Sequence, residues 1–207
     1  MSRKNQTSEL KIRVMDVALS HFSDVGVERT NIDKILKGAE CSVGSLYHHF
    51  GNKEGVAEAL FIDGVDQFNT ALLQALLPQK TAKAGIKAIV TFCCEWVTNK
   101  SRLAAFLLSR EIKLSESAKQ ELRELDSEFS HALHDWFVPH VSSGALLKLP
   151  TDMYMALISG PTLEYSRRWL AQRSQKPPGD VASILSEAAW QAVKNNAKVA
   201  GRHDAVP

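Results

Sequence analysis

The sequence predicts an all-α protein of about nine helices. Apolar residues recur three or four positions apart through most of the 207 residues, which is the period of one face of a helix. Capping residues and prolines divide this pattern into segments of helical length. No segment shows the alternation of apolar and polar residues that is typical of a half-buried strand.

The first helix is predicted from Glu9, because apolar residues then recur at helical spacing as far as Phe22. Gly26 is well placed to end this helix in a left-handed conformation that other residues adopt at a cost. The polar residues before Glu9 carry no such pattern and are predicted to lie outside the helix.

Two short helices and a tight turn are predicted next. Thr30 is expected to begin the first of them, with its hydroxyl accepting from the N–H of Asp33 in a capping box. Residues 38–41 form the turn, and Ser42 is expected to cap the helix that follows. This order predicts a helix-turn-helix.

The helix after Ser42 has an unusual outer face. Leu46 and Phe50 lie four residues apart and point to the core, which leaves an outward set of five residues: Val43, Gly44, Ser45, Tyr47 and His48. A glycine inside a helix costs about 1 kcal/mol relative to alanine. Gly44 therefore either relaxes the turn or allows close approach to another surface, such as the major groove of DNA.

Groups that bind phosphate flank this helix. Tyr47 offers a hydroxyl and His48 an imidazole N–H, while Asn52 begins a further helix with Lys53 in its first turn. Helix N-termini attract anions, and Thr30 is predicted to present a second one. The formal net charge of only +2 means that placement, and not overall charge, carries the argument for DNA.

Helical segments fill the rest of the chain. The predicted ranges are 53–77, 81–100, 101–110, 115–138, 150–173 and 180–196. The corresponding domains are a helix-turn-helix domain at 1–55, a helical domain at 56–200 and a flexible tail at 201–207. In the last two helices a second apolar surface with small residues suggests dimerisation; the alternative is that Trp169 and Trp190 complete the protein's own core. The interface candidates are Tyr165, Trp169, Ile184, Leu185, Ala188 and Ala192.

Residues 9–60 resemble the DNA-binding domain of the TetR family of transcriptional repressors. The matching positions include Phe22, Gly26, Thr30, Ser42, Gly44, Leu46, Tyr47, His49, Phe50, Lys53 and Glu54. The resemblance implies phosphate contacts at Thr30, Ser42, Tyr47, His48 and Lys53, and base or groove contacts at Val43, Gly44 and Ser45. Glu40 stands where the family usually has glycine in the turn, and Val43 where it often has a basic residue.

The resemblance also implies a ligand cavity among the middle helices. Its candidate walls are Phe92, Trp96, Phe106, Phe129, His134, Trp136 and Tyr154, and plain core packing is the alternative for each. The implied function is a homodimeric repressor that an unknown, largely apolar effector releases from a palindromic operator in double-stranded DNA. No cofactor, metal or membrane partner is implied.

Other classes of function find less support in the residues. No nucleophile motif, phosphate-binding loop or metal-ligand motif indicates an enzyme. Cys93 and Cys94 leave a redox or metal sensor as an alternative, but neighbours on a helix point about 100° apart and cannot bridge. A DNA-binding dimer without an effector is a further alternative. Three cysteines and the absence of an apolar leader predict a cytoplasmic protein.

Overall fold

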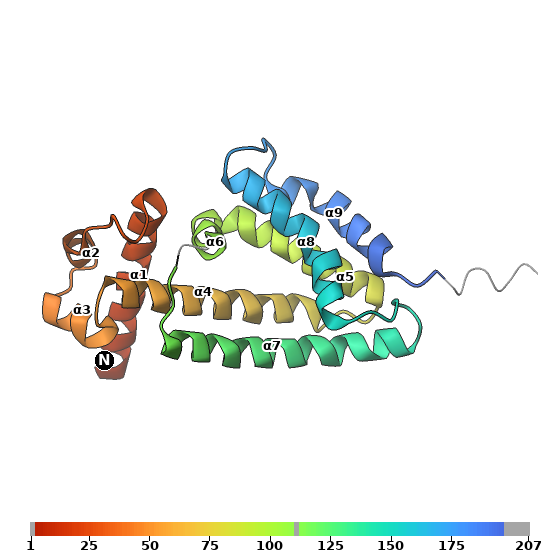
Figure 1. Ribbon diagram of the computed structural model, residues 1–207, viewed down its shortest axis with the longest axis horizontal. Coiled ribbons are helices and arrows are strands. Elements are labelled where there is room, and N and C mark those ends of the chain that lie inside the picture. The colour runs from red at the N-terminus through yellow and green to blue at the C-terminus, as the bar shows by residue number, and fades with distance from the viewer. Residues whose placement is uncertain (1–2, 110–111, 197–207) are drawn as a thin grey trace, which may run out of the picture. The chain divides into compact units, whose positions relative to one another are not determined.

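The computed structural model describes residues 3–109 and 112–196, except for the side chains of residues 3–6 and 151–152. These ranges contain nine helices and no strand, which confirms the predicted all-α class (Figure 1). The predicted tail at 201–207 lies outside the described residues. The helices are α1 (Arg3–Val25), α2 (Ile32–Gly38), α3 (Val43–Phe50), α4 (Lys53–Leu76), α5 (Ala82–Asn99), α6 (Ser101–Leu108), α7 (Glu116–Ser142), α8 (Thr151–Leu170) and α9 (Pro178–Val193).

The chain forms two compact units. The described residues of 1–67 and 100–125 make the first unit, and those of 68–99 and 126–207 make the second. Helices α4 and α7 each contribute to both, so the units differ from the two segments predicted with a boundary after residue 55. The two units are defined by which residues pack together. The predicted boundary was placed where the helix-turn-helix ends in the sequence.

The apolar faces of four helices build the core of the first unit. Its buried side chains come from α1, α2, α3 and α4: Val14, Ala18, Phe22, Ile35, Leu46, Val56 and Leu60. Helix α6 adds Phe106, whose ring stacks on Phe22 with centroids 6.0 Å apart. Glu58 of α4 accepts hydrogen bonds from the Ser115 backbone N–H at 2.5 Å and from its hydroxyl at 2.9 Å, which fixes the start of α7 to α4.

Helix α1 begins earlier than the sequence predicts, whereas its end agrees with the prediction. Helix α1 begins at Arg3 and not at Glu9, because polar residues can continue a helix without showing its apolar period. Gly26 ends it with a φ of 81°, as predicted. Glu40 adopts a φ of 51° in the predicted turn, a left-handed conformation that costs a non-glycine residue about 1 kcal/mol.

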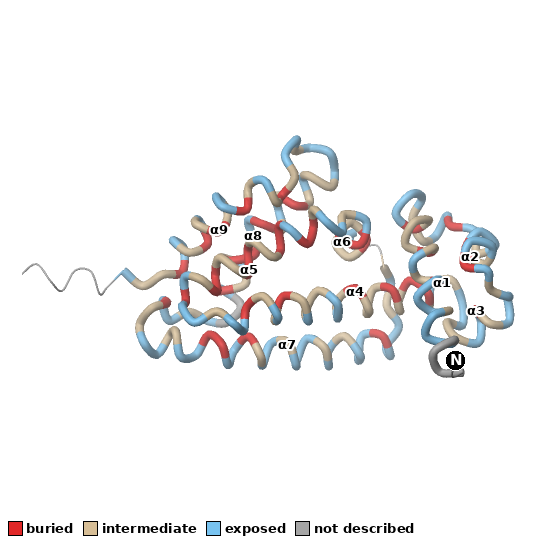
Figure 2. Tube along the Cα trace, turned by 180° about the vertical axis from the view of Figure 1, so that it is seen from behind, coloured by how far each residue is buried: buried red, intermediate tan, exposed pale blue. Residues whose placement is uncertain are grey.

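Helices α5, α8 and α9 form the centre of the second unit, together with the last part of α4 and most of α7. Buried positions, red in Figure 2, run along α5 and α8. Gly85 of α5 allows a close approach: a Cβ atom there would lie 2.0 Å from the Trp136 ring. The Trp136 indole N–H donates to the Gln79 carbonyl at 3.1 Å, so this ring is fixed on both sides.

Helix ends in this unit depart from prediction by a few residues. Helix α7 runs through Pro139 to Ser142 and so passes the predicted end at Val138. Helix α8 ends at Leu170, three residues before the predicted end at Arg173, and Gln172 follows with a φ of 57°. No helix in the described part of the chain is long and apolar enough to cross a membrane.

Candidate nucleic-acid interface

Helix α3 presents the outer face that the sequence predicted. The Ser42 hydroxyl accepts from the Ser45 N–H at 3.1 Å, which confirms the predicted cap. Leu46 is buried, whereas 56% of Val43 and 50% of Tyr47 is exposed. Gly44 and His48 are also exposed, so a short capped helix offers a small and partly apolar surface to the outside.

Gly44 has no internal reason to be glycine. It lies inside α3, its φ is not positive, and a Cβ atom built on it meets nothing within 4 Å in the described structure. The first explanation, relaxation of the turn, therefore finds no support, because the turn's left-handed residue is Glu40. A helical glycine that costs stability and relieves no crowding within the protein suggests close approach from outside.

The two histidines at the end of α3 sit edge to face, with ring centroids 4.9 Å apart. Desolvation lowers the pKa of His49, and the positive charges of His48 and Lys11 lower it further. His48 is the exposed member of the pair. In the described residues, no group of three or more His, Cys, Asp or Glu side chains is arranged to hold a metal ion.

Thr30 does not cap α2. Its side chain is only 4% exposed, and its hydroxyl donates to the Gly26 carbonyl at 2.7 Å. Asn31 is the cap instead, because its side-chain oxygen accepts from the Asp33 N–H at 2.9 Å. The capping prediction at Thr30 was wrong by one residue, and burial removes the Thr30 hydroxyl from the outward surface.

Lys53 holds two parts of the first unit together. Its ammonium group donates to the carbonyls of Glu28 at 2.8 Å and Thr30 at 3.0 Å. The carbonyl oxygen of the Asn52 side chain accepts from the Gly55 N–H at 2.7 Å and caps α4 beside it. Lys53 thus ties the first turn of α4 to the segment before α2, an internal role that the sequence did not indicate.

Two exposed lysines are not among the predicted DNA-binding residues. Lys34 and Lys37 are exposed on α2, the helix that precedes α3. The spacing of these lysines on a short helix could have indicated from the sequence that both are exposed. The predicted set thus divides into exposed Ser42, Val43, Gly44, Tyr47 and His48, half-buried Ser45 and Lys53, and buried Thr30.

Two of the seven predicted ligand-cavity walls line a cavity of the second unit. A cavity in the second unit includes His134 and Tyr154 in its lining, but none of the other five predicted residues. Phe92, Trp96, Phe129 and Trp136 belong to the apolar core of this unit or pack against it. Phe106 was wrongly grouped with them, because it packs on Phe22 in the first unit.

The predicted dimer residues divide between an exposed face and the core. Ile184 is 70% exposed, and Ala188 and Ala192 are exposed one and two turns further along α9. Leu185 packs against the core. Tyr165 and Trp169 of α8 are half-buried, and the Tyr165 hydroxyl donates to the Lys176 carbonyl at 3.0 Å.

The surroundings of all three cysteines raise the pKa values of their thiols. Burial, with the neighbouring Cys94 adding to it, raises the pKa of Cys93 to about 12. Burial also raises the pKa of Cys94 to about 11. Burial raises the pKa of half-buried Cys41 as well. Thiolates are the reactive form, so these environments disfavour a redox sensor.

Residues 14–60 match the sequence model of the family described as bacterial regulatory proteins, tetR family. Over 173 residues the chain is 24% identical to the HTH-type transcriptional repressor KstR2 of Rhodococcus jostii (strain RHA1), which covers 83% of this chain and 82% of that protein. A 47-residue stretch is 45% identical to the A-factor receptor protein of Streptomyces griseus and covers 23% of this chain and 17% of that protein.

The fold of the chain is found among solved structures. FadR from Bacillus subtilis, solved in complex with stearoyl-CoA, superposes with a TM-score of 0.74. The match covers 87% of this chain and 98% of that chain, at 18% sequence identity. The shared fold extends well beyond the residues of the helix-turn-helix.

Proposed function

Because this chain belongs to the TetR family of bacterial regulatory proteins, we propose that it is a dimeric, sequence-specific transcriptional repressor. It binds a palindromic operator and leaves it when a small, largely apolar effector binds. The observation that carries this proposal is the outer face of α3, where Val43 and Tyr47 are exposed and nothing lies within 4 Å of a Cβ atom built on Gly44. Such a face fits the floor and walls of the major groove.

The residues that cap α3 or lie on its outer side have proposed contacts. Val43 meets a thymine methyl group, and Ser45 donates to or accepts from a base edge, so these two residues set sequence preference. Ser42, Tyr47 and His48 lie against phosphates and set affinity and register. Lys53 supports this surface by fixing the segment before α2, and Thr30 acts through its carbonyl in the same contact.

The proposed dimer forms through α8 and α9. Ile184, Ala188 and Ala192 give α9 an exposed apolar ridge of large and small side chains, which suits helix-on-helix packing. A twofold axis through this interface pairs two α3 helices. Two such helices read half-sites separated by about 34–36 Å or a multiple of that distance.

The effector part of the proposal is supported by the apolar second unit and by the ligand-bound FadR of the same fold. A DNA-binding dimer without an effector is the second candidate, because the core aromatics of this unit pack against one another and need no ligand. The buried thiols make the redox sensor the weakest reading.

The test is a selection of bound sequences from a random pool of DNA duplexes, with purified protein at near-physiological salt. Enrichment of one palindrome supports a dimeric sequence reader. Enrichment of a single half-site refutes the dimer, and recovery of unenriched sequences from folded protein refutes sequence-specific recognition.

A further inference from the structure

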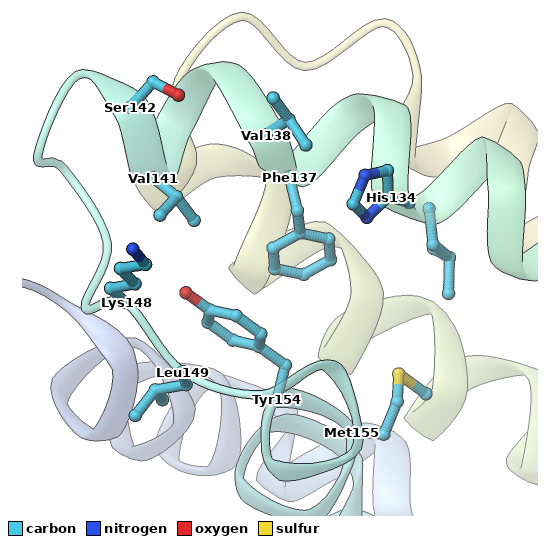
Figure 3. Close-up of a pocket in the computed structure, with 10 residues that line it drawn as sticks. His134, Phe137, Val138, Val141, Ser142, Lys148, Leu149, Tyr154 and Met155 are labelled. Atoms are coloured by element: carbon cyan, nitrogen blue, oxygen red, sulfur yellow. The ribbon is translucent and has the colours of Figure 1, made fainter.

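The cavity that includes His134 and Tyr154 lies between the last turns of α7, the loop after it and the start of α8 (Figure 3). Its volume is about 220 Å³. Phe137 and Val141 of α7 and Met155 of α8 give it apolar walls. Exposed Val138, also in the lining, extends this apolar surface outward.

Internal contacts shape this cavity before any ligand binds. The Tyr154 hydroxyl donates to the Leu147 carbonyl and so holds the loop against α8. The Tyr154 and Phe137 rings lie with centroids 4.9 Å apart. In Figure 3 the side chain of Lys148, the residue after Leu147, extends on the same side of the cavity as the Tyr154 hydroxyl. A preformed site of this kind loses little entropy when a ligand enters.

The electrostatics of the cavity favour an anion. Lys148 is the only lysine or arginine in the described lining, and that lining holds no Asp or Glu. Three backbone carbonyls in the last turn of α7, which would otherwise repel an anion, already accept hydrogen bonds. The Ser143 N–H donates to Pro139 at 3.0 Å, the Ala145 N–H to His140 at 3.0 Å and the Gly144 N–H to Val141 at 2.9 Å. Helix α8, whose cap Pro150 makes no side-chain bond, adds the positive end of its dipole nearby.

We propose that this cavity binds a small apolar monocarboxylate. Its hydrocarbon part packs against Phe137, Val141 and Met155, and its carboxylate pairs with Lys148. The volume holds roughly seven water-sized groups, which is close to the size of hexanoate or benzoate. This ligand class would be the effector, so the regulatory meaning of the site rests on the proposed function, whereas binding itself does not.

The first test measures binding by isothermal titration calorimetry without DNA. Three probes share one hydrocarbon chain and differ in the head group: hexanoate, 1-hexanol and hexylamine. Hexanoate is expected to bind most tightly and hexylamine least. Lys148→Met should weaken hexanoate about fivefold, the effect of a partly exposed ion pair, and leave 1-hexanol unchanged. Lys148→Arg should keep the preference, and Lys80→Met, at an exposed lysine outside the lining, should have no effect.

A filling variant locates the bound molecule. Val141→Phe should abolish binding of hexanoate and 1-hexanol alike, because the added ring occupies the cavity. Equal affinity of the parent protein for all three probes, or an undiminished hexanoate preference in Lys148→Met, overturns the inference. A second arm adds hexanoate to the complex with selected DNA. Binding without release from DNA leaves the site standing and refutes its role as effector site, whereas absent DNA binding refutes the proposed function alone.

Discussion

Replacing Gly44 by alanine should stabilise the protein and weaken its binding to DNA. A Cβ atom at this position meets nothing within 4 Å, and the backbone is helical, so the folded protein accepts alanine without strain. The gain in the free energy of unfolding is up to about 1 kcal/mol, the difference in helix propensity between the two residues. For a chain of this length that gain corresponds to a rise in Tm of about 2–4 °C.

The same methyl group enters the proposed contact with the major groove. Displacement of α3 from the groove should reduce the free energy of binding by about as much as one mismatched base pair does, about 1–3 kcal/mol. This corresponds to roughly a 5- to 150-fold rise in Kd for the selected operator. Gly44→Leu, with a larger side chain, should abolish specific binding while the protein stays folded.

The assay pairs thermal unfolding with titration of labelled operator DNA at fixed salt. Ser130→Ala, at an exposed position inside α7, is the control, because it raises helix propensity without touching the recognition surface. A Gly44→Ala protein that binds the operator as tightly as the parent refutes close approach at Gly44. A loss of stability refutes the conclusion that the glycine has no internal function.

Three further predictions concern other parts of the chain. Lys53→Met removes two hydrogen bonds to the carbonyls before α2 and should lower the free energy of unfolding by about 1 kcal/mol, with weaker binding to all DNA sequences alike; weaker binding to the operator only would contradict this. Ile184→Glu should give monomers in sedimentation and lose the operator, whereas Leu77→Glu, at a similarly exposed residue outside α8 and α9, should remain dimeric. Because their pKa values are raised to about 12 and about 11, Cys93 and Cys94 should react with iodoacetamide at pH 8 only after unfolding, and fast labelling of the folded protein would restore the redox reading.

The sequence was most informative where one helix face decides the structure. The spacing of Leu46 and Phe50 predicted which side of α3 turns outward, and Ser42 predicted its start, because an unpaired N–H at a helix end needs an acceptor. Glu40, at a turn position where the family usually has glycine, adopts the left-handed conformation that glycine favours. These features depend on neighbours within a few residues.

The sequence failed where a choice depended on which partner the folded chain supplies. Thr30 and Asn31 are both good caps, and the Gly26 carbonyl, which accepts the Thr30 hydroxyl, leaves Asn31 as the cap. Lys53 was assigned to phosphate because the carbonyls that it binds lie 23 and 25 residues away. Apolar period predicted that aromatics such as Phe106 are buried, but it does not say which helix covers them.

The bond between Lys53 and the carbonyls before α2 has a consequence for how an effector would act. The first residue of α4 holds the start of α2, and Glu58, one turn and a half later, holds the start of α7. A displacement of this end of α4 would therefore move the segment before α2 and the start of α7 with it, without requiring a change within α3. Effector binding would then change the distance between the two α3 helices of a dimer. It would not change the contacts that each α3 helix makes with its own half-site. An isolated half-site should consequently be bound equally well with and without inducer, while the full palindrome is released.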